Sequence, residues 1–143
     1  MRSILRLFLP SLAMVILFSC ELIDDNPGTD DVHDKIEGQW KCDESSQIYK
    51  STESFYWIYI DPDPDDTTKV IISNFYDLGD NIFIYAQLNN LNLSIARQTT
   101  KDGYTILSGY GTISSNYKEI NWNYKVDDGS GEVDNATAKY TRD

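Results

Sequence analysis

Two short stretches of the sequence alternate strictly between apolar and polar side chains. Residues 120–124 read Ile-Asn-Trp-Asn-Tyr, and residues 91–95 read Leu-Asn-Leu-Ser-Ile. A repeat of two residues is typical of a β-strand with one buried face and one solvated face. From about residue 36 onward, no window of about 11 residues carries the apolar stripe of an amphipathic helix. The sequence therefore predicts an all-β domain.

Turn-forming residues divide this domain into segments of similar length. Asp, Asn, Gly, Pro and Ser gather between the apolar segments, and these residue types favour turn conformations. We expect eight strands, near residues 36–46, 53–60, 68–76, 81–88, 91–98, 103–113, 117–126 and 132–142. Because closing a sheet removes its exposed edges, eight short sequential strands favour a single antiparallel up-and-down β-barrel. A two-sheet β-sandwich is the alternative architecture.

The alternation also predicts which side chains face the interior. In the seventh expected strand, Trp122 and Tyr124 share the buried phase. Gly109 and Gly111 lie two residues apart in the sixth strand, which indicates a sharp bend or a backbone that passes close beneath a large ring. The second strand has no polar face over residues 55–60. Either both of its faces are covered, or one face presents an apolar patch to a partner.

The N-terminus has the composition of a secretory signal. Arg2 and Arg6 precede an apolar run at residues 7–17, which is shorter than the roughly 20 residues that span a bilayer. The sequence then becomes acidic and includes Pro and Gly, as in a solvated spacer. We therefore expect a signal peptide at 1–19, an acidic flexible tether at 20–35 and one β-barrel domain at 36–143.

The end of this signal reads Leu17, Phe18, Ser19 and Cys20, and it resembles the lipobox of bacterial lipoproteins. The resemblance implies that the Cys20 thiol is acylated and becomes the new N-terminus. Because each buried CH₂ contributes about 0.8 kcal/mol, two or three acyl chains hold a protein on a membrane almost irreversibly. The acidic residues that follow resemble the signal that sends lipoproteins of the Bacteroides group to the cell surface. This implies a surface-exposed outer-membrane lipoprotein, with a periplasm-facing orientation as the alternative.

Charge and composition argue against several classes of function. The net charge of the 143-residue chain is −11, and it becomes −13 without the signal, which holds two arginines and no acid. Such a charge repels phosphate backbones, so we expect no nucleic-acid partner. If Cys20 is acylated, Cys42 has no cysteine left to pair with, and we expect it to be buried. The single histidine, His33, falls in the tether, so a Cys–His nucleophile is not expected. We expect no enzymatic activity, no metal and no cofactor.

An acidic loop at residues 61–66 places oxygen ligands at alternate positions, as a calcium loop does. An EF-hand needs Gly at the sixth place and Glu at the twelfth, and Asp66 and Ile72 stand there instead. We interpret the loop as a solvated hairpin tip. The same interpretation applies to the acids around the last turn, Asp127, Asp128, Glu132 and Asp134.

Gly38, Gln39 and Trp40 in the first expected strand, together with Arg142 in the last, resemble the lipocalin pattern. In that family a Gly-x-Trp places its indole across one end of the barrel, and an arginine from the last strand packs over it. Trp40 and Arg142 both have inward phases, as such a cation–π lid requires. The resemblance covers about residues 36 to 142. With the lipobox, it is a resemblance to small lipocalin-like lipoproteins of the Bacteroides group.

Aromatic side chains are the remaining functional signal. The candidate contact residues for a ligand or partner are Trp57, Tyr59, Tyr85, Tyr110, Trp122 and Tyr124. They favour a membrane-anchored, non-enzymatic binding module for a small apolar ligand, a glycan or an envelope protein. The alternative is a packed barrel that acts as a structural or inhibitory protein-interaction module without an internal ligand. Inward rings at Trp57 and Tyr59 favour a pocket or core, and outward rings favour an interface.

Overall fold

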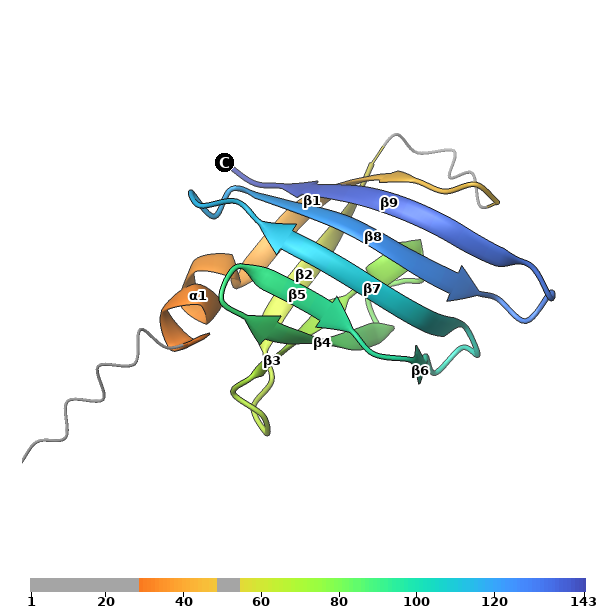
Figure 1. Cartoon of the computed structure of the whole chain (residues 1–143), viewed down its shortest axis with the longest axis horizontal. Coiled ribbons are helices and arrows are strands. Elements are labelled where there is room, and N and C mark those ends of the chain that lie inside the picture. The colour runs from red at the N-terminus through yellow and green to blue at the C-terminus, as the bar shows by residue number, and fades with distance from the viewer. Residues whose placement is uncertain (1–28, 49–54) are drawn as a thin grey trace, which may run out of the picture.

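The computed structural model describes residues 29–48 and 55–143 of the chain (Figure 1). Within these ranges, a short helix and a 3-10 turn accompany a set of β-strands. The elements in chain order are α1 (Thr29–Ile36), β1 (Gly38–Ser45), β2 (Tyr56–Pro62), β3 (Lys69–Ser73), η1 (Phe75–Asp77), β4 (Phe83–Asn89), β5 (Asn92–Ile95), β6 (Gln98–Thr99), β7 (Thr105–Ile113), β8 (Glu119–Asp127) and β9 (Val133–Thr141).

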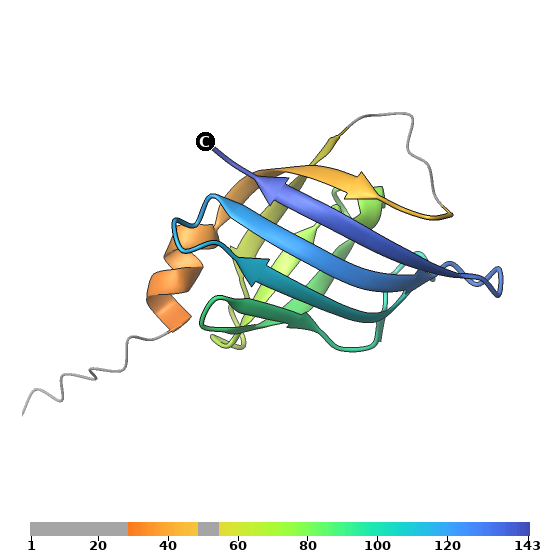
Figure 2. The ribbon, with the colours of Figure 1, turned by 45° about the horizontal axis from the view of Figure 1, so that its top comes forward.

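The strands form one closed antiparallel sheet. From β1 to β5, each strand pairs with the next one along the chain. The short strands β5 and β6 both pair with β7, so together they occupy one position in the sheet. Strands β7, β8 and β9 follow in order, and β9 pairs with β1. The result is an eight-stranded up-and-down barrel, as predicted, and not the two-sheet sandwich (Figure 2).

The largest interior side chains of β8 face small residues on both neighbouring strands. Along β8, buried and exposed side chains alternate, and Trp122 and Tyr124 are among the buried ones. Trp122 lies between Gly111 and Ala138, and Tyr124 lies between Gly109 and Ala136. Glycine and alanine leave the space that the two rings occupy, so the barrel interior is packed by complementary side-chain sizes across adjacent strands.

Gly111 lies directly against the indole of Trp122. A Cβ atom at Gly111 would be 2.9 Å from three atoms of the Trp122 side chain, closer than real Cβ contacts come. At Gly109, a Cβ would be 2.7 Å from the Cδ1 atom of Ile95. The alternative that the sequence raised for these glycines, a backbone passing beneath a large ring, is therefore what the structure shows at Gly111.

Helix α1 is the main difference from the expected architecture. Its residues before Ile36 fall in the segment assigned to a flexible tether, but the helix packs on one end of the barrel with Ile36 fully buried and Val32 against the core. His33, expected in solvent, is 5% exposed, and its Nε2 atom lies 2.8 Å from the carbonyl oxygen of Thr67. Eight residues give only two turns, too few to produce a recognisable helical stripe in the sequence.

We expect Gly111→Ala to destabilise the barrel by about 1 to 3 kcal/mol, because the added methyl group would overlap the Trp122 indole. Thr112→Ala, which changes an exposed side chain on the same strand, is the matched control and is expected to cost about half a kcal/mol. Urea unfolding followed by tryptophan fluorescence measures both values. Equal stability of the two variants would contradict the close packing described for Gly111.

Candidate functional site

The barrel end next to α1 is covered by a cation–π pair. The guanidinium carbon of Arg142 lies 4.5 Å from the centre of the Trp40 ring. Arg142 Nη1 donates to the carbonyl oxygen of Glu37 (2.9 Å), and its Nε donates to that of Tyr117 (3.2 Å). The indole N–H of Trp40 donates to the carbonyl oxygen of Ile36 at 2.8 Å. The contact that the lipocalin resemblance implied is present, and it joins the end of the last strand to α1 and β1.

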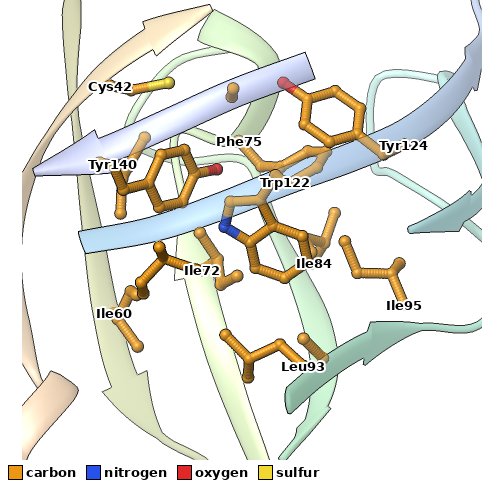
Figure 3. Close-up of a cluster of buried hydrophobic side chains, with 14 of the residues drawn as sticks. Cys42, Ile60, Ile72, Phe75, Ile84, Leu93, Ile95, Trp122, Tyr124 and Tyr140 are labelled. Carbon is orange, nitrogen blue, oxygen red and sulfur yellow. The ribbon is translucent and has the colours of Figure 1, made fainter. Parts of the chain in front are cut away.

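Aromatic rings fill the middle of the barrel (Figure 3). Phe75 packs against Tyr124 with ring centres 4.6 Å apart, and Trp122 packs against Tyr140 at 5.9 Å. Trp122 and Tyr124 are 1% and 3% exposed, so these two candidate contact residues are core residues. The Trp122 Nε1 and Tyr140 hydroxyl have no hydrogen-bond partner among the described residues, and an ordered water is the smallest group that would satisfy either.

The other four candidate contact residues point outward. Trp57 is 49% exposed and Tyr59 is 45% exposed, whereas the alternate residues of β2, among them Ile58, are buried. Tyr85 on β4 and Tyr110 on β7 are exposed as well. The outward phase of Trp57 and Tyr59 is the outcome that favours an interface over an internal pocket.

Five exposed aromatic side chains gather on the outer side of β2 and β4. We call this surface the aromatic face, and its members are Phe55, Trp57, Tyr59, Phe83 and Tyr85. Strand β3 lies between the two strands, and its Ser73 pairs with Tyr59 on one side and with Phe83 on the other. The other outward side chains of β3 are Lys69 and Ile71. The rings of the aromatic face therefore lie on either side of β3.

Four of the five rings of the aromatic face form two pairs. Phe55 meets Trp57 edge to face with ring centres 6.0 Å apart, and Phe83 meets Tyr85 in the same way at 5.7 Å. The ammonium group of Lys41 lies 4.1 Å from the centre of the Phe55 ring. Edge-to-face pairs and a cation over a ring stabilise this arrangement of the side chains.

A groove of about 320 Å³ runs along this face beside Trp57 and Tyr59. Its polar lining includes Gln39, Asp61 and Asp80. Apolar rings next to amide and carboxylate groups form the mixture of apolar centre and polar rim that protein interfaces show.

The opposite end of the barrel carries a half-buried carboxylate that the sequence analysis missed. Glu44 on β1 accepts hydrogen bonds from the hydroxyls of Tyr56 (2.7 Å) and Tyr124. Burial is the main cause that raises the pKa of Glu44 to about 7, against the hydrogen bond from Tyr56, which lowers it. Glu44 shares the inward phase of Trp40 and Cys42, and that phase is the signal by which it could have been found.

Asp134 lies at the same end and is 3% exposed. Its carboxylate accepts hydrogen bonds from the hydroxyls of Ser46 and Tyr76, and from the backbone N–H groups of Gln47 (2.8 Å) and Ile48 (3.3 Å). Burial alone would raise the pKa of Asp134, but these donors outweigh it and hold the pKa below its ordinary value. The interpretation of Asp134 as an ordinary solvated acid is therefore wrong, because its β9 phase points inward.

The acidic loop between β2 and β3 is organised by its own hydrogen bonds. Asp63 is buried and accepts from the backbone N–H of Asp65 at 2.9 Å. Asp66 accepts from Thr68 and pairs with Lys69 at 2.7 Å, and these contacts lower the pKa of Asp66 to about 2. Within residues 29–48 and 55–143, no group of three or more His, Cys, Asp or Glu side chains is arranged to hold a metal ion.

Cys42 is fully buried, as expected, and it is not in a disulfide. Burial raises the pKa of its thiol far above the ordinary value. A thiol that stays protonated is a poor nucleophile, so the environment of Cys42 suits a packing role.

Comparison of the chain with protein-family models finds no match, and comparison with curated proteins finds no significant match either. Among the described residues, none of the helices has the length and apolar character needed to cross a membrane. Cys20 lies outside the described residues, so its acylation stays a prediction from the sequence.

The raised pKa of Glu44 predicts a pH dependence of folding. Because the folded chain holds the Glu44 proton more tightly than the unfolded chain does, its contribution to stability is greatest below the ordinary pKa of 4.5 and is lost as the pH rises through about 7. Glu44→Gln removes this charge, so relative to the parent it is expected to gain about 1 to 3 kcal/mol between pH 4.5 and pH 8.

Urea unfolding midpoints of parent and variant at the two pH values measure this shift. Glu132→Gln, which changes an exposed acid in the last turn, is the control, and its difference in stability from the parent is expected to be similar at the two pH values. A difference between Glu44→Gln and the parent that is the same at both pH values would show that Glu44 ionises normally.

Proposed function

We propose that the protein is an outer-membrane lipoprotein, held at the membrane by acyl chains on Cys20. In this proposal its barrel is a non-enzymatic binding module whose aromatic face contacts an envelope protein. One observation carries the proposal: five large aromatic side chains are exposed together on one outer surface, while the barrel interior is filled. The resemblance to lipocalins is part of the proposal, and the closed barrel with Arg142 over Trp40 supports it.

The energetics of exposed rings favour a protein partner. An aromatic side chain can bury about 150 to 250 Å² of surface, and about 25 cal/mol is gained for each Å² of apolar area removed from water. Trp and Tyr are enriched among the residues that dominate binding energy at protein interfaces. Exposed rings that gather on one face, instead of being scattered, mark an interaction site.

The polar groups around the aromatic face fit the rim of such an interface. Lys41 provides a cation beside Phe55, and Asp61 and Asp80 provide carboxylates beside the groove. Both signs of charge are present at the edge, whereas the centre is made of Trp57 and Tyr59. A partner that covers the centre with apolar groups and meets the rim with opposite charges satisfies both parts.

Anchoring depends on one thiol in this proposal, so Cys20→Ser is expected to release the protein from the membrane fraction. The parent is expected to remain with the membranes and to incorporate a labelled fatty acid, because two or three acyl chains bind almost irreversibly. Cys42→Ser is the control and should leave both properties unchanged. If Cys20→Ser partitions with membranes as the parent does, the anchor is not at this residue.

A photo-reactive residue tests the aromatic face. We expect p-benzoylphenylalanine in place of Tyr59 to form a cross-linked species with an envelope protein on intact cells of the native host. The same group in place of Thr112, an exposed position on β7, is the matched control and should give no such species. The Trp57→Ser substitution should reduce the cross-linked product, because it removes the neighbouring ring. Equal cross-linking from both positions, or none from Tyr59, would contradict the proposal.

A further inference from the structure

The outer surface of the barrel away from the aromatic face is polar instead of aromatic. It is formed by β5, β7, β8 and β9, which lie side by side in Figure 2. Across these strands and their neighbours, one row of paired residues runs without any charged member. In spatial order the row is Gln87, Ser94, Tyr110, Asn123, Thr137 and Ser45. All six side chains are exposed.

A second row runs beside the first and is also uncharged over four strands. Its members in spatial order are Asn89, Asn92, Thr112 and Asn121. Charge begins only at the next member, Lys139, whose ammonium group pairs with Glu119 at 2.8 Å. In a chain with 23 acidic residues, two adjacent rows of amides and hydroxyls are a distinct surface, which we call the amide face.

A shallow trough of about 490 Å³ lies at the edge of the amide face, between its first row and the neighbouring row of Ser108, Lys125 and Asn135. Its volume is within the range of about 300 to 1,000 Å³ typical of small-molecule sites. The side chains that line it include Ser108, Tyr110, Asn123, Lys125, Asn135 and Thr137. Gly109 also belongs to the lining through its backbone, because a Cβ atom at this position would point inward, toward Ile95.

Tyr110 provides an apolar surface at this trough. Its side chain is 53% exposed, and its hydroxyl donates to the Oδ1 atom of Asn92 at 2.6 Å. This hydrogen bond reaches from the first row to the second and holds the ring in place on the face. A ring held in one position loses little conformational entropy when a ligand stacks on it.

The hydrogen-bond donors and acceptors that line the trough indicate which class of ligand it can bind. Each Asn amide offers two donors and one acceptor oxygen, and each Ser or Thr hydroxyl can both donate and accept. An anionic ligand would meet only Lys125 as a cation, and a cationic ligand would meet no carboxylate in the lining. An apolar ligand would remove amides and hydroxyls from water without replacing their hydrogen bonds, at a cost of about 1 to 3 kcal/mol for each group.

We propose that the amide face is a binding site for a neutral carbohydrate chain. Sugar hydroxyls both donate and accept, as the Asn123, Asn135 and Thr137 side chains require, and the C–H face of a sugar ring stacks on Tyr110. The rows extend over several strands, so the site accommodates consecutive sugar units of a polysaccharide. The trough is lined mainly by β7, β8 and β9, whereas the aromatic face lies on β2 and β4, and the proposal does not depend on the proposed protein partner.

Binding of the full chain to soluble polysaccharides tests this site. The probes are dextran, laminarin and mannan as neutral chains and polygalacturonate as an acidic chain, with affinity electrophoresis and calorimetry as readouts. We expect retardation by at least one neutral chain and none by polygalacturonate. Tyr110→Ala and Asn123→Asp are each expected to weaken binding by about tenfold, because the first removes the stacking ring and the second a donor.

Matched substitutions on the aromatic face separate this site from the other one. Gln39→Glu introduces the same charge change as Asn123→Asp, and Tyr59→Ala removes an exposed ring as Tyr110→Ala does; both should bind the neutral chain as the parent does. Thermal unfolding shows whether each variant is folded. Absence of binding to every neutral chain, binding to polygalacturonate alone, or equal losses from the matched variants on the two faces would overturn the proposal.

Discussion

The packing of two large rings on β8 determines what the rest of the barrel can do. Trp122 and Tyr124 each lie between a glycine on β7 and an alanine on β9, so these two large side chains fit without spreading the strands. At about 25 cal/mol per Å², each such ring contributes about 4 to 6 kcal/mol of apolar burial. Because these rings occupy the interior, both proposed binding surfaces, the aromatic face and the amide face, lie on the outside of the barrel.

The two ends of the barrel are covered by different chemistry. At one end, Arg142 places a cation over Trp40 and uses its remaining donors on backbone carbonyls. At the other end, Glu44 and Asp134 bring carboxylates under tyrosine hydroxyls. Burial dominates at Glu44, whose pKa rises, whereas four donors dominate at Asp134, whose pKa falls. Asp134 accepts from four donors and Glu44 from two, and the additional donors favour the charged form of Asp134.

The alternation of apolar and polar residues was sufficient to predict most of the fold, because the polarity of each side chain in a half-buried strand indicates whether it points inward or outward. The strands and the buried phase of Trp122 followed from that pattern, whereas the close approach at Gly111 was one of two alternatives that the sequence left open. Helix α1 could not be predicted in this way. It has only two turns and contacts the core through Val32 and Ile36, which is too few apolar positions to reveal a period of 3.6 residues. The outward direction of Trp57 was undecidable, since apolar residues occupy both phases of β2. The amide face depends on the register between as many as six strands, which the sequence of a single strand does not reveal.

The pairing of β1 with β9 joins the two barrel strands that are most distant in the sequence. Closing so long a loop is entropically expensive and slow compared with forming the local hairpins. Before β9 takes its place, β1 and β8 both present unpaired backbone N–H and C=O groups, and such edges recruit strands from other chains. Proteolysis that removes β9 would therefore convert a sealed barrel into an open sheet prone to edge-to-edge aggregation.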